Sequence, residues 1–184
     1  MRVISGIARG RKLVAPEGLD VRPTTDKVKE SIFNILQFEL PDSRVLDLFA
    51  GSGQLGLEAL SRGAASCTFI DNSARSLQFV KENLEHTGLD RLPVTLRQEE
   101  AAVFLQRTQD TFDIALLDPP YHKQILDRIL PLLAPHLSDS GIILCETARD
   151  ETLPETAGMF RKAKEYDYGK IKLTLFRHIG DTDE

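Results

Sequence analysis

The chain has 184 residues, of which 41% are hydrophobic and 28% charged, a composition that suits one globular domain with a substantial core. We expect a soluble, cytoplasmic protein, because no stretch resembles a secretory signal and no apolar run approaches the roughly 18 residues of a membrane helix. Cys67 and Cys145 lie far apart in apolar runs without metal-ligand spacing, which favours buried reduced thiols over a disulfide or a metal site.

Charge is distributed unevenly along the chain. The net charge is −5, but residues 1–29 carry seven basic and three acidic side chains, a local net charge of +4, which leaves −9 for the remaining residues. A basic segment on an acidic body is suited to place one face against phosphates. The plainer alternative is a solvated surface loop, because short runs of charge usually are that.

The predicted elements begin with short strands or turns in residues 2–16, punctuated by glycine, followed by a loop. A helix is predicted from Thr25, because Thr24 or Thr25 can cap it and apolar residues then recur at helical spacing as far as Leu36. Pro41 closes this segment, and strands and helices alternate after it. The predicted strands are residues 44–50, 66–71, 93–98, 112–118 and 141–146. The predicted helices are residues 53–63, 73–86, 99–107 and 127–135.

This alternation implies a mostly parallel sheet with helices on both faces, and residues 162–178 add an antiparallel hairpin around Gly169. We therefore predict an α/β fold: a single Rossmann-like domain with a mostly parallel seven-stranded sheet, a C-terminal antiparallel hairpin and a small basic extension. The predicted division is an N-terminal hairpin or loop in residues 1–24 and the main domain in residues 25–184.

A glycine-rich stretch, DLFAGSGQLG, follows the first strand of the alternating region. Gly51, Gly53 and Gly56 have the G-x-G-x-x-G spacing, which lets a backbone turn tightly and approach a ligand closely. Asp71 lies 20 residues after Gly51 at the end of the next strand, where a carboxylate can accept hydrogen bonds from both hydroxyls of a ribose. The spacing is shared with dinucleotide oxidoreductases, so it indicates a nucleoside-containing cofactor without identifying it.

Asp47 narrows the choice of cofactor. A carboxylate at this place would repel the pyrophosphate of a dinucleotide, whereas it would attract a ligand that carries an ammonium group. S-adenosylmethionine has both a ribose and such an ammonium, so it is the cofactor that these residues favour. The alternative is that Asp47 only caps amides of the loop.

The stretch DIALLDPPYHK ends the fourth strand with an acid, two prolines and a tyrosine. Ligands of such sheets bind beyond the carboxyl ends of the strands, so this tetrapeptide is predicted to face the same crevice as the glycine loop. The prolines restrict the backbone and hold the Asp118 carboxylate and the Pro119 carbonyl as two acceptors for the N–H groups of an exocyclic amine. Tyr121 offers an aromatic face to an unstacked base. The alternative is a proline-terminated strand with an incidental acid.

The sequence resembles a known family. DPPY resembles motif IV, and DLFAGSG motif I, of the amino-methyltransferases that act on adenine N6, cytosine N4 or guanine N2. The blocks RGRKL, RPTTDKVKESIFNIL, LDLFAGSGQLGLEALSRGA and DPPY resemble the bacterial 16S rRNA (guanine(966)-N2)-methyltransferase family, an RsmD-like group, over nearly the whole chain. The resemblance implies a class I methyltransferase domain that uses S-adenosyl-L-methionine and methylates N2 of one guanine, with 16S rRNA in the assembled small ribosomal subunit as substrate.

The motifs and the resemblance together assign site residues. The predicted catalytic residues are Asp118, Pro119, Pro120 and Tyr121. The predicted cofactor-binding residues are Asp47, Phe49, Ala50, Gly51, Ser52, Gly53, Asp71, Asn72, Glu100 and Ala101. Glu100 is preferred to Glu99 for the contact with the cofactor adenine, where the family usually carries a shorter acid. The residues predicted to contact RNA are Arg2, Arg9, Arg11, Lys12, Arg22, Thr24 and Thr25.

The expected mechanism is direct in-line transfer without a covalent intermediate, because neither cysteine lies in a strand-end loop. No metal is expected, since the histidines are scattered without ligand spacing, and we expect a monomer. An adenine-N6 DNA or RNA methyltransferase with the same tetrapeptide is the main alternative function. A nicotinamide-dependent oxidoreductase using the glycine loop and a cofactor-binding scaffold without catalysis are further alternatives.

Overall fold

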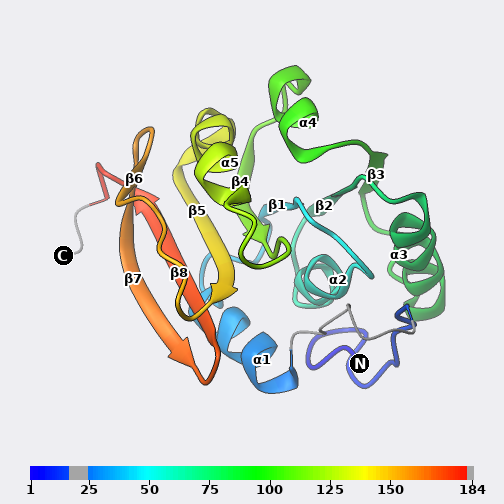
Figure 1. Cartoon of the computed structure of the whole chain (residues 1–184). Coiled ribbons are helices and arrows are strands. Elements are labelled where there is room, and N and C mark those ends of the chain that lie inside the picture. Colours follow the sequence, from blue (N-terminus) through cyan, green and yellow to red (C-terminus); the bar gives the residue numbers. More distant parts are fainter. Residues whose placement is uncertain (17–24, 182–184) are drawn as a thin grey trace.

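The computed structural model describes residues 1–16 and 25–181, which form one eight-stranded sheet with helices on both faces (Figure 1). The strand order is β3-β2-β1-β4-β5-β8-β7-β6. The parallel strands are β1 (Arg44–Asp47), β2 (Ser66–Asp71), β3 (Val94–Gln98), β4 (Phe112–Leu117) and β5 (Leu137–Ala148). The antiparallel strands are β6 (Thr156–Ala157), β7 (Phe160–Tyr168) and β8 (Ile171–His178).

The sheet confirms the predicted α/β class and the antiparallel hairpin, with one difference in strand number. Seven strands were expected, and the eighth is β6, a two-residue strand that pairs with β7 at the sheet edge. So short a strand has no alternating pattern of its own, and only its pairing with β7 defines it. Strand β5 is also longer than expected, because its first residues follow directly from the turn after α5.

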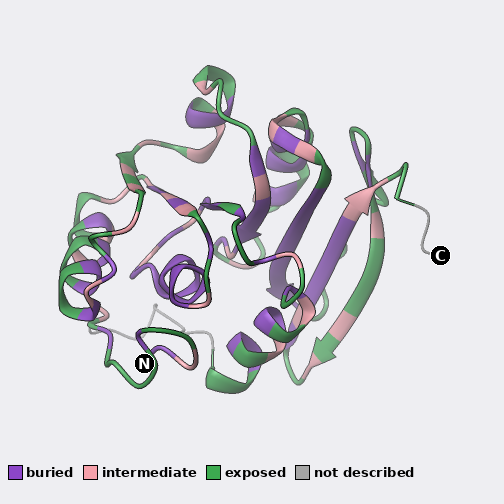
Figure 2. Ribbon diagram, turned by 180° about the vertical axis from the view of Figure 1, so that it is seen from behind, coloured by how far each residue is buried: buried purple, intermediate pink, exposed green. Residues whose placement is uncertain are grey.

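The helices form two layers. One face of the sheet carries α1 (Asp26–Ile35), α2 (Gln54–Ser61) and α3 (Ala74–Thr87), and the other carries α4 (Ala101–Arg107) and α5 (Ile125–Leu133), which continues into the 3-10 turn η1 (Ala134–His136). Successive residues of a strand point to opposite faces, so Ile142 and Leu144 join one apolar core while Ile143 and Cys145 join the other. Figure 2 shows these strands buried between the two layers.

Local sequence signals explain several helix ends. The Thr25 hydroxyl accepts a hydrogen bond from the Val28 amide at 3.3 Å and caps α1, as predicted. Gly88 ends α3 in the left-handed conformation, with a φ of 73°. Helix α5 begins at Ile125, two residues before its predicted start. The preceding residue, Gln124, has a left-handed backbone conformation, so the helix does not extend further toward the N-terminus.

Strand order decides where the site lies. Strand β1 lies between β2 and β4, so the direction of winding reverses there. The loops that follow β1 and β4 therefore emerge side by side at the carboxyl edge of the sheet, as the sequence predicted.

The structure also contains, in the ranges given above, no helix that is long and apolar enough to cross a membrane. Cys67 and Cys145 are both free and buried.

Candidate active site

The loop after β1 turns sharply at two glycines and is held by an acid from β2. Gly51 and Gly53 have φ angles of 56° and 82°, in the left-handed region that favours glycine. The Asp71 carboxylate accepts hydrogen bonds from the Gly51 and Ser73 amides, both at 2.9 Å. Each carboxylate oxygen can accept a second hydrogen bond, so these contacts leave Asp71 able to bind further donors.

Asp47 ends β1 and is only 1% exposed. Its Oδ2 accepts a hydrogen bond from the Gly56 amide in the first turn of α2 at 2.9 Å, so it does cap an amide, and it also lines the cavity described below. Burial raises the pKa of Asp47 to about 7; the Gly56 hydrogen bond opposes this shift, and the charge of Asp71 adds to it. A cationic group beside this buried carboxylate would lower its pKa again and would be bound favourably.

One cavity of about 680 Å³ connects the loop after β1 with the loop after β4. Nine of the predicted cofactor-binding residues line it: Asp47, Phe49, Ala50, Gly51, Ser52, Asp71, Asn72, Glu100 and Ala101. The four predicted catalytic residues line it as well: Asp118, Pro119, Pro120 and Tyr121. Gly53 is not part of this lining, because it is buried where α2 begins and its amide donates to the Ala50 carbonyl at 2.7 Å.

Both acids after β3 line this cavity. The Glu99 carboxylate accepts a hydrogen bond from Arg107 Nη1 at 2.9 Å, whereas Glu100 is exposed at the start of α4 and makes no capping bond with its side chain. This difference favours Glu100 for a ligand contact, and the adenine contact stays a prediction.

The double-proline corner, Asp118 to Tyr121, leaves the end of β4 with Pro119 buried and Pro120 exposed. The Tyr121 hydroxyl donates a hydrogen bond to Glu146 Oε1 at 2.6 Å, which fixes the outer end of the ring. Glu146 lies in β5 and is 2% exposed. Glu146 was not among the predicted site residues, because it lies 25 residues from Tyr121 and within the apolar run of a strand.

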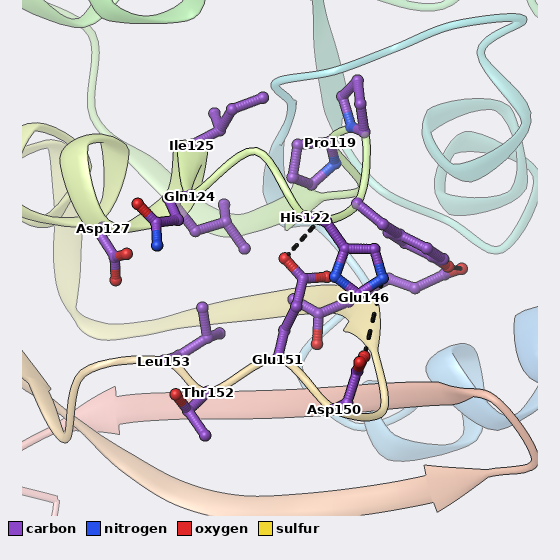
Figure 3. A pocket seen from close by; sticks show the side chains of 14 residues that line it. Pro119, His122, Gln124, Ile125, Asp127, Glu146, Asp150, Glu151, Thr152 and Leu153 are labelled. Carbon is purple, nitrogen blue, oxygen red and sulfur yellow. Dashed lines mark hydrogen bonds and ion pairs between the residues drawn. The ribbon is translucent and has the colours of Figure 1, made fainter.

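A second, smaller pocket of about 330 Å³ lies on the other side of this corner (Figure 3). Pro119, Pro120, Tyr121 and Ile125 line both hollows, so the corner forms a wall between them. Four carboxylates line the smaller pocket, and its lining by described residues includes neither lysine nor arginine; the four acids are Asp127, Glu146, Asp150 and Glu151. Such a lining repels phosphate and suits groups that donate N–H hydrogen bonds.

The basic arm (residues 1–16) folds back on itself and packs against α2 and α3. Arg2 and Lys12 form an isolated antiparallel bridge, and the apolar residues Val3, Ala8 and Leu13 are buried in the core cluster that includes α2 and α3. The predicted RNA-contacting side chains of Arg2, Arg9, Arg11 and Lys12 are exposed, and Arg2 pairs with Asp26 at 3.1 Å. Arg22 and Thr24 lie outside the described residues.

The arm is attached to the domain through buried polar groups. Glu58, fully buried in α2, accepts hydrogen bonds from the Ile4 and Ser5 amides at 2.8 and 3.0 Å. Lys29 is buried beside it, with its Nζ 3.7 Å from Glu58 and bonded to the Arg2 carbonyl. Burial lowers the pKa of Lys29, and the charge of Glu58 opposes that shift.

Asn83 of α3 joins the end of the arm to the glycine loop. Its side chain accepts from the Val14 amide at 2.7 Å and donates to the Val14 and Ser52 carbonyls at 2.8 and 3.0 Å. Met1 also reaches this loop, because the Ser52 hydroxyl lies 3.5 Å from the Met1 sulfur and both residues line the larger cavity. The arm therefore borders the predicted cofactor site.

Comparison with known proteins identifies the family. The family model for Conserved hypothetical protein 95 matches residues 1–177. The chain belongs to this family. Among its relatives, a Bacillus subtilis protein named "Putative rRNA methyltransferase YlbH" is 42% identical, covering 98% of this chain and all of the relative. Ribosomal RNA small subunit methyltransferase D of Escherichia coli is 35% identical, covering 96% of this chain and 89% of the relative.

Solved structures of relatives have the same fold. A structure titled "Putative methyltransferase yhhF from Escherichia coli" superimposes with a TM-score of 0.86 at 36% identity, covering 97% of each chain. These matches confirm the family resemblance read from the motifs and the class I methyltransferase fold.

Two structural observations indicate that the residues lining the larger cavity fit S-adenosylmethionine. A Cβ placed on Gly51 would meet no protein atom within 4 Å, so the loop leaves open space where it borders the cavity. The amide oxygen of Gln54, a cavity-lining residue that is 8% exposed, is buried and has no hydrogen-bond partner among the described residues. Gln54 was not among the predicted site residues, because an amide inside a glycine motif has no distinctive spacing.

Metal ligation has no candidate in the part of the chain that the structure describes. No group of three or more His, Cys, Asp or Glu residues within residues 1–16 and 25–181 could hold an ion. His122 lies at the smaller pocket, where its Nε2 is 3.7 Å from the Asp150 carboxylate, and His136 bonds to the Leu105 carbonyl instead.

Proposed function

We propose that the protein transfers a methyl group from S-adenosylmethionine to the N2 amine of one guanine in 16S rRNA, with the small ribosomal subunit as substrate. The observation that carries this proposal is the single cavity lined by both the glycine loop and the Asp118–Tyr121 corner. The names of the relatives, an rRNA methyltransferase and a small subunit rRNA methyltransferase, support it.

In this proposal the residues on the β1 side hold the cofactor. Asp47, buried at the cavity wall, binds the ammonium, and Asp71 accepts hydrogen bonds from the ribose hydroxyls. Glu100 contacts the adenine from the start of α4. When bound, the cofactor supplies an electrophilic methyl group on a positively charged sulfur.

The residues on the β4 side hold the base. The Asp118 carboxylate and the Pro119 carbonyl each accept one N–H of the exocyclic amine, which draws the nitrogen toward tetrahedral geometry and frees its lone pair. Tyr121 stacks on the base, which must leave the RNA stack to reach this depth. With the cofactor bound, formation of the N–CH3 bond would break the S–CH3 bond and leave a neutral thioether. The amine nitrogen would then lose one proton, for which the Asp118 carboxylate is the adjacent acceptor, without a covalent enzyme intermediate.

Substrate placement falls to the exposed cations of the arm, because the described chain offers no separate recognition domain. Arg9, Arg11 and Lys12 contact RNA phosphates in this proposal, which positions the subunit without reading its sequence. The Met1 side chain at the cavity and the Asn83 bonds to both arm and glycine loop connect this surface to the cofactor site.

The test is methylation of small subunits that lack the modification. Purified protein with isotopically labelled cofactor should label 16S rRNA in such subunits, and mass spectrometry of nuclease fragments should place the methyl group on N2 of a single guanine. Subunits that already carry the modification are the control and should stay unlabelled. Label on adenine N6 of duplex DNA or RNA, with none on subunits, would replace this proposal by the adenine-N6 alternative.

A further inference from the structure

Glu146 lies next to the amine clamp, the two proposed acceptors of the exocyclic amine, Asp118 and the Pro119 carbonyl. Leu117, the last residue of β4, pairs with Cys145 of β5, so Asp118 directly after β4 follows this pair on one side and Glu146 of β5 follows it on the other. Glu146 is almost fully buried and accepts the hydrogen bond of the Tyr121 hydroxyl at 2.6 Å. That length is typical of a strong hydrogen bond from a hydroxyl to a carboxylate.

Tyr121 needs such an anchor, because its ring forms part of the wall between the two hollows. A tyrosine on a loop can rotate about two side-chain torsions, and a base can stack only if the ring plane is held. Fixing the hydroxyl to a residue inside the sheet removes that freedom at the far end of the ring. Glu146 thus couples the ring to β5, a strand that is paired on both sides in the sheet.

The neighbouring backbone is held in the same way. His122 and Gln124 have φ angles of 58° and 52°, uncommon for residues with side chains. The Glu151 carboxylate accepts hydrogen bonds from the His122 and Ala148 amides, both at 2.9 Å, which ties this loop to the turn after β5 (Figure 3). Two acids from one segment, Glu146 and Glu151, therefore restrain two consecutive residues, Tyr121 and His122.

We propose that Glu146 is a positioning residue for methyl transfer, which acts only through its hydrogen bond with Tyr121 by holding the ring on which the target base stacks. This inference rests on the proposed function. It assigns Glu146 no direct contact with the base or the cofactor. The effect of changing Glu146 must therefore vanish once the Tyr121 hydroxyl is removed.

The test is a double-mutant cycle on subunit methylation with Glu146→Ala, Tyr121→Phe and the double variant. Each single change should lower kcat/KM for the subunit about ten-fold, the size expected for loss of one hydrogen bond to a charged acceptor. The double variant should be no worse than either single variant within about two-fold, because both changes break the same interaction. Glu146→Gln keeps an acceptor oxygen and should recover most of the activity.

Controls separate positioning from folding. Cofactor affinity measured by calorimetry should stay within about three-fold in every variant, since the glycine loop is untouched. Thr174→Val is the matched control: Thr174 is fully buried in the adjacent strand β8, its hydroxyl has no partner among the described residues, and the change should leave activity unaltered. If Glu146→Ala unfolds the protein, Glu146→Leu, which fills nearly the same space without an acceptor oxygen, replaces it in the cycle.

Multiplying effects in either cycle would overturn the inference, because Glu146 would then act on the base or the cofactor directly. Equal activity of Glu146→Ala and the wild-type protein would also overturn it. Failure of the proposed function is distinguishable, since in that case the wild-type protein itself would not methylate subunits.

Discussion

The basic arm and the glycine loop both border the larger cavity, and interactions of different range hold them in place. The glycine loop is held by Asp47 and Asp71, which lie at the ends of the strands on either side of α2. The arm is held by Glu58 and Asn83, which lie more than 50 residues further along the chain. The two acids thus bind loop amides at most 20 residues away, with one longer-range bond from Asn83 to Ser52, whereas the arm depends on the finished domain.

This difference bears on function. The arm is held through buried hydrogen bonds, so in the proposed function RNA binding would not have to order its backbone, and only the exposed side chains would lose freedom. The acids that hold the glycine loop, Asp47 and Asp71, line the cavity, where a cationic or hydrogen-bond-donating ligand would balance their charge. Changes in the two regions should therefore separate into losses of folding stability and losses of ligand affinity.

The largest effect is expected from removing the Glu58 carboxylate, which binds the arm to α2. Glu58→Ala removes the carboxylate that pairs with the buried charge of Lys29, which keeps only its bond to the Arg2 carbonyl, and leaves the Ile4 and Ser5 amides without their acceptor. The free energy of unfolding should fall by about 3–5 kcal/mol, measured by urea denaturation. Glu85→Ala, on the exposed surface of α3, is the control and should change it by less than about 0.5 kcal/mol. A loss below about 1 kcal/mol in Glu58→Ala would show that the arm is held elsewhere.

Breaking the amine clamp should affect chemistry alone. Asp118→Ala removes one of the two proposed acceptors, so turnover on small subunits should fall about 100-fold to 1000-fold, as when one preorganised group of an active site is lost. Cofactor affinity should change little, and Asp118→Asn, which keeps one acceptor oxygen, should lose less turnover. Near-normal turnover in Asp118→Ala would contradict the clamp.

Asp47→Asn tests the ligand side of the comparison. Loss of the charge should weaken S-adenosylmethionine about 10-fold to 100-fold by calorimetry, because a hydrogen bond to a charged group is lost while the amide can still accept from Gly56. In the wild-type protein, affinity should rise with pH up to about 7, the pKa of Asp47, because the ammonium favours the ionised carboxylate. A flat pH profile in the wild-type protein would contradict the proposed contact.

The same group predicts the direction of a stability change. The pKa of Asp47 is raised from 3.8 to about 7 on folding, so the folded protein keeps this proton where the unfolded chain has lost it. Its contribution to the free energy of unfolding therefore decreases as pH rises between about 4 and 7. In Asp47→Asn that decrease should be absent, which urea denaturation at several pH values would measure.

The smallest effect is expected at the arm surface. Arg9→Glu with Arg11→Glu should weaken subunit binding about ten-fold at moderate salt and reduce the salt dependence of binding by about one power per cation. Stability and cofactor affinity should not change, because both side chains are exposed. The matched control, Lys164→Glu with Lys170→Glu on the β7–β8 hairpin, changes the same charge elsewhere. Equal weakening in both would indicate that only net charge matters.

The elements of the site that are local in the chain could be predicted. The ends of β1, β2 and β4 carry Asp47, Asp71 and Asp118, and strand order in such folds brings these ends to one edge. The same reasoning placed Thr25 as the cap of α1. Gly53 does not line the cavity, and a spacing motif alone does not distinguish a glycine that faces the ligand from one that shapes the turn.

Contacts between distant segments could not be predicted. Nothing near Glu146 in the sequence indicates that its carboxylate meets Tyr121, and nothing near Asn83 points to Val14 or Ser52. The smaller pocket, with its four acids, depends on the turn after β5 folding toward the corner after β4. The short strand β6 exists only through its pairing with β7.

By itself the sequence determined the alternating α/β pattern, the glycine turn, the acids at the strand ends and the double-proline corner, because these follow from backbone restrictions and from periodicity over a few residues. Only the tertiary structure decided how the arm is anchored, which carboxylate holds Tyr121 and where the second pocket lies. Those features depend on buried hydrogen bonds between strands and helices far apart in the chain, and their partners are chosen by packing and not by spacing.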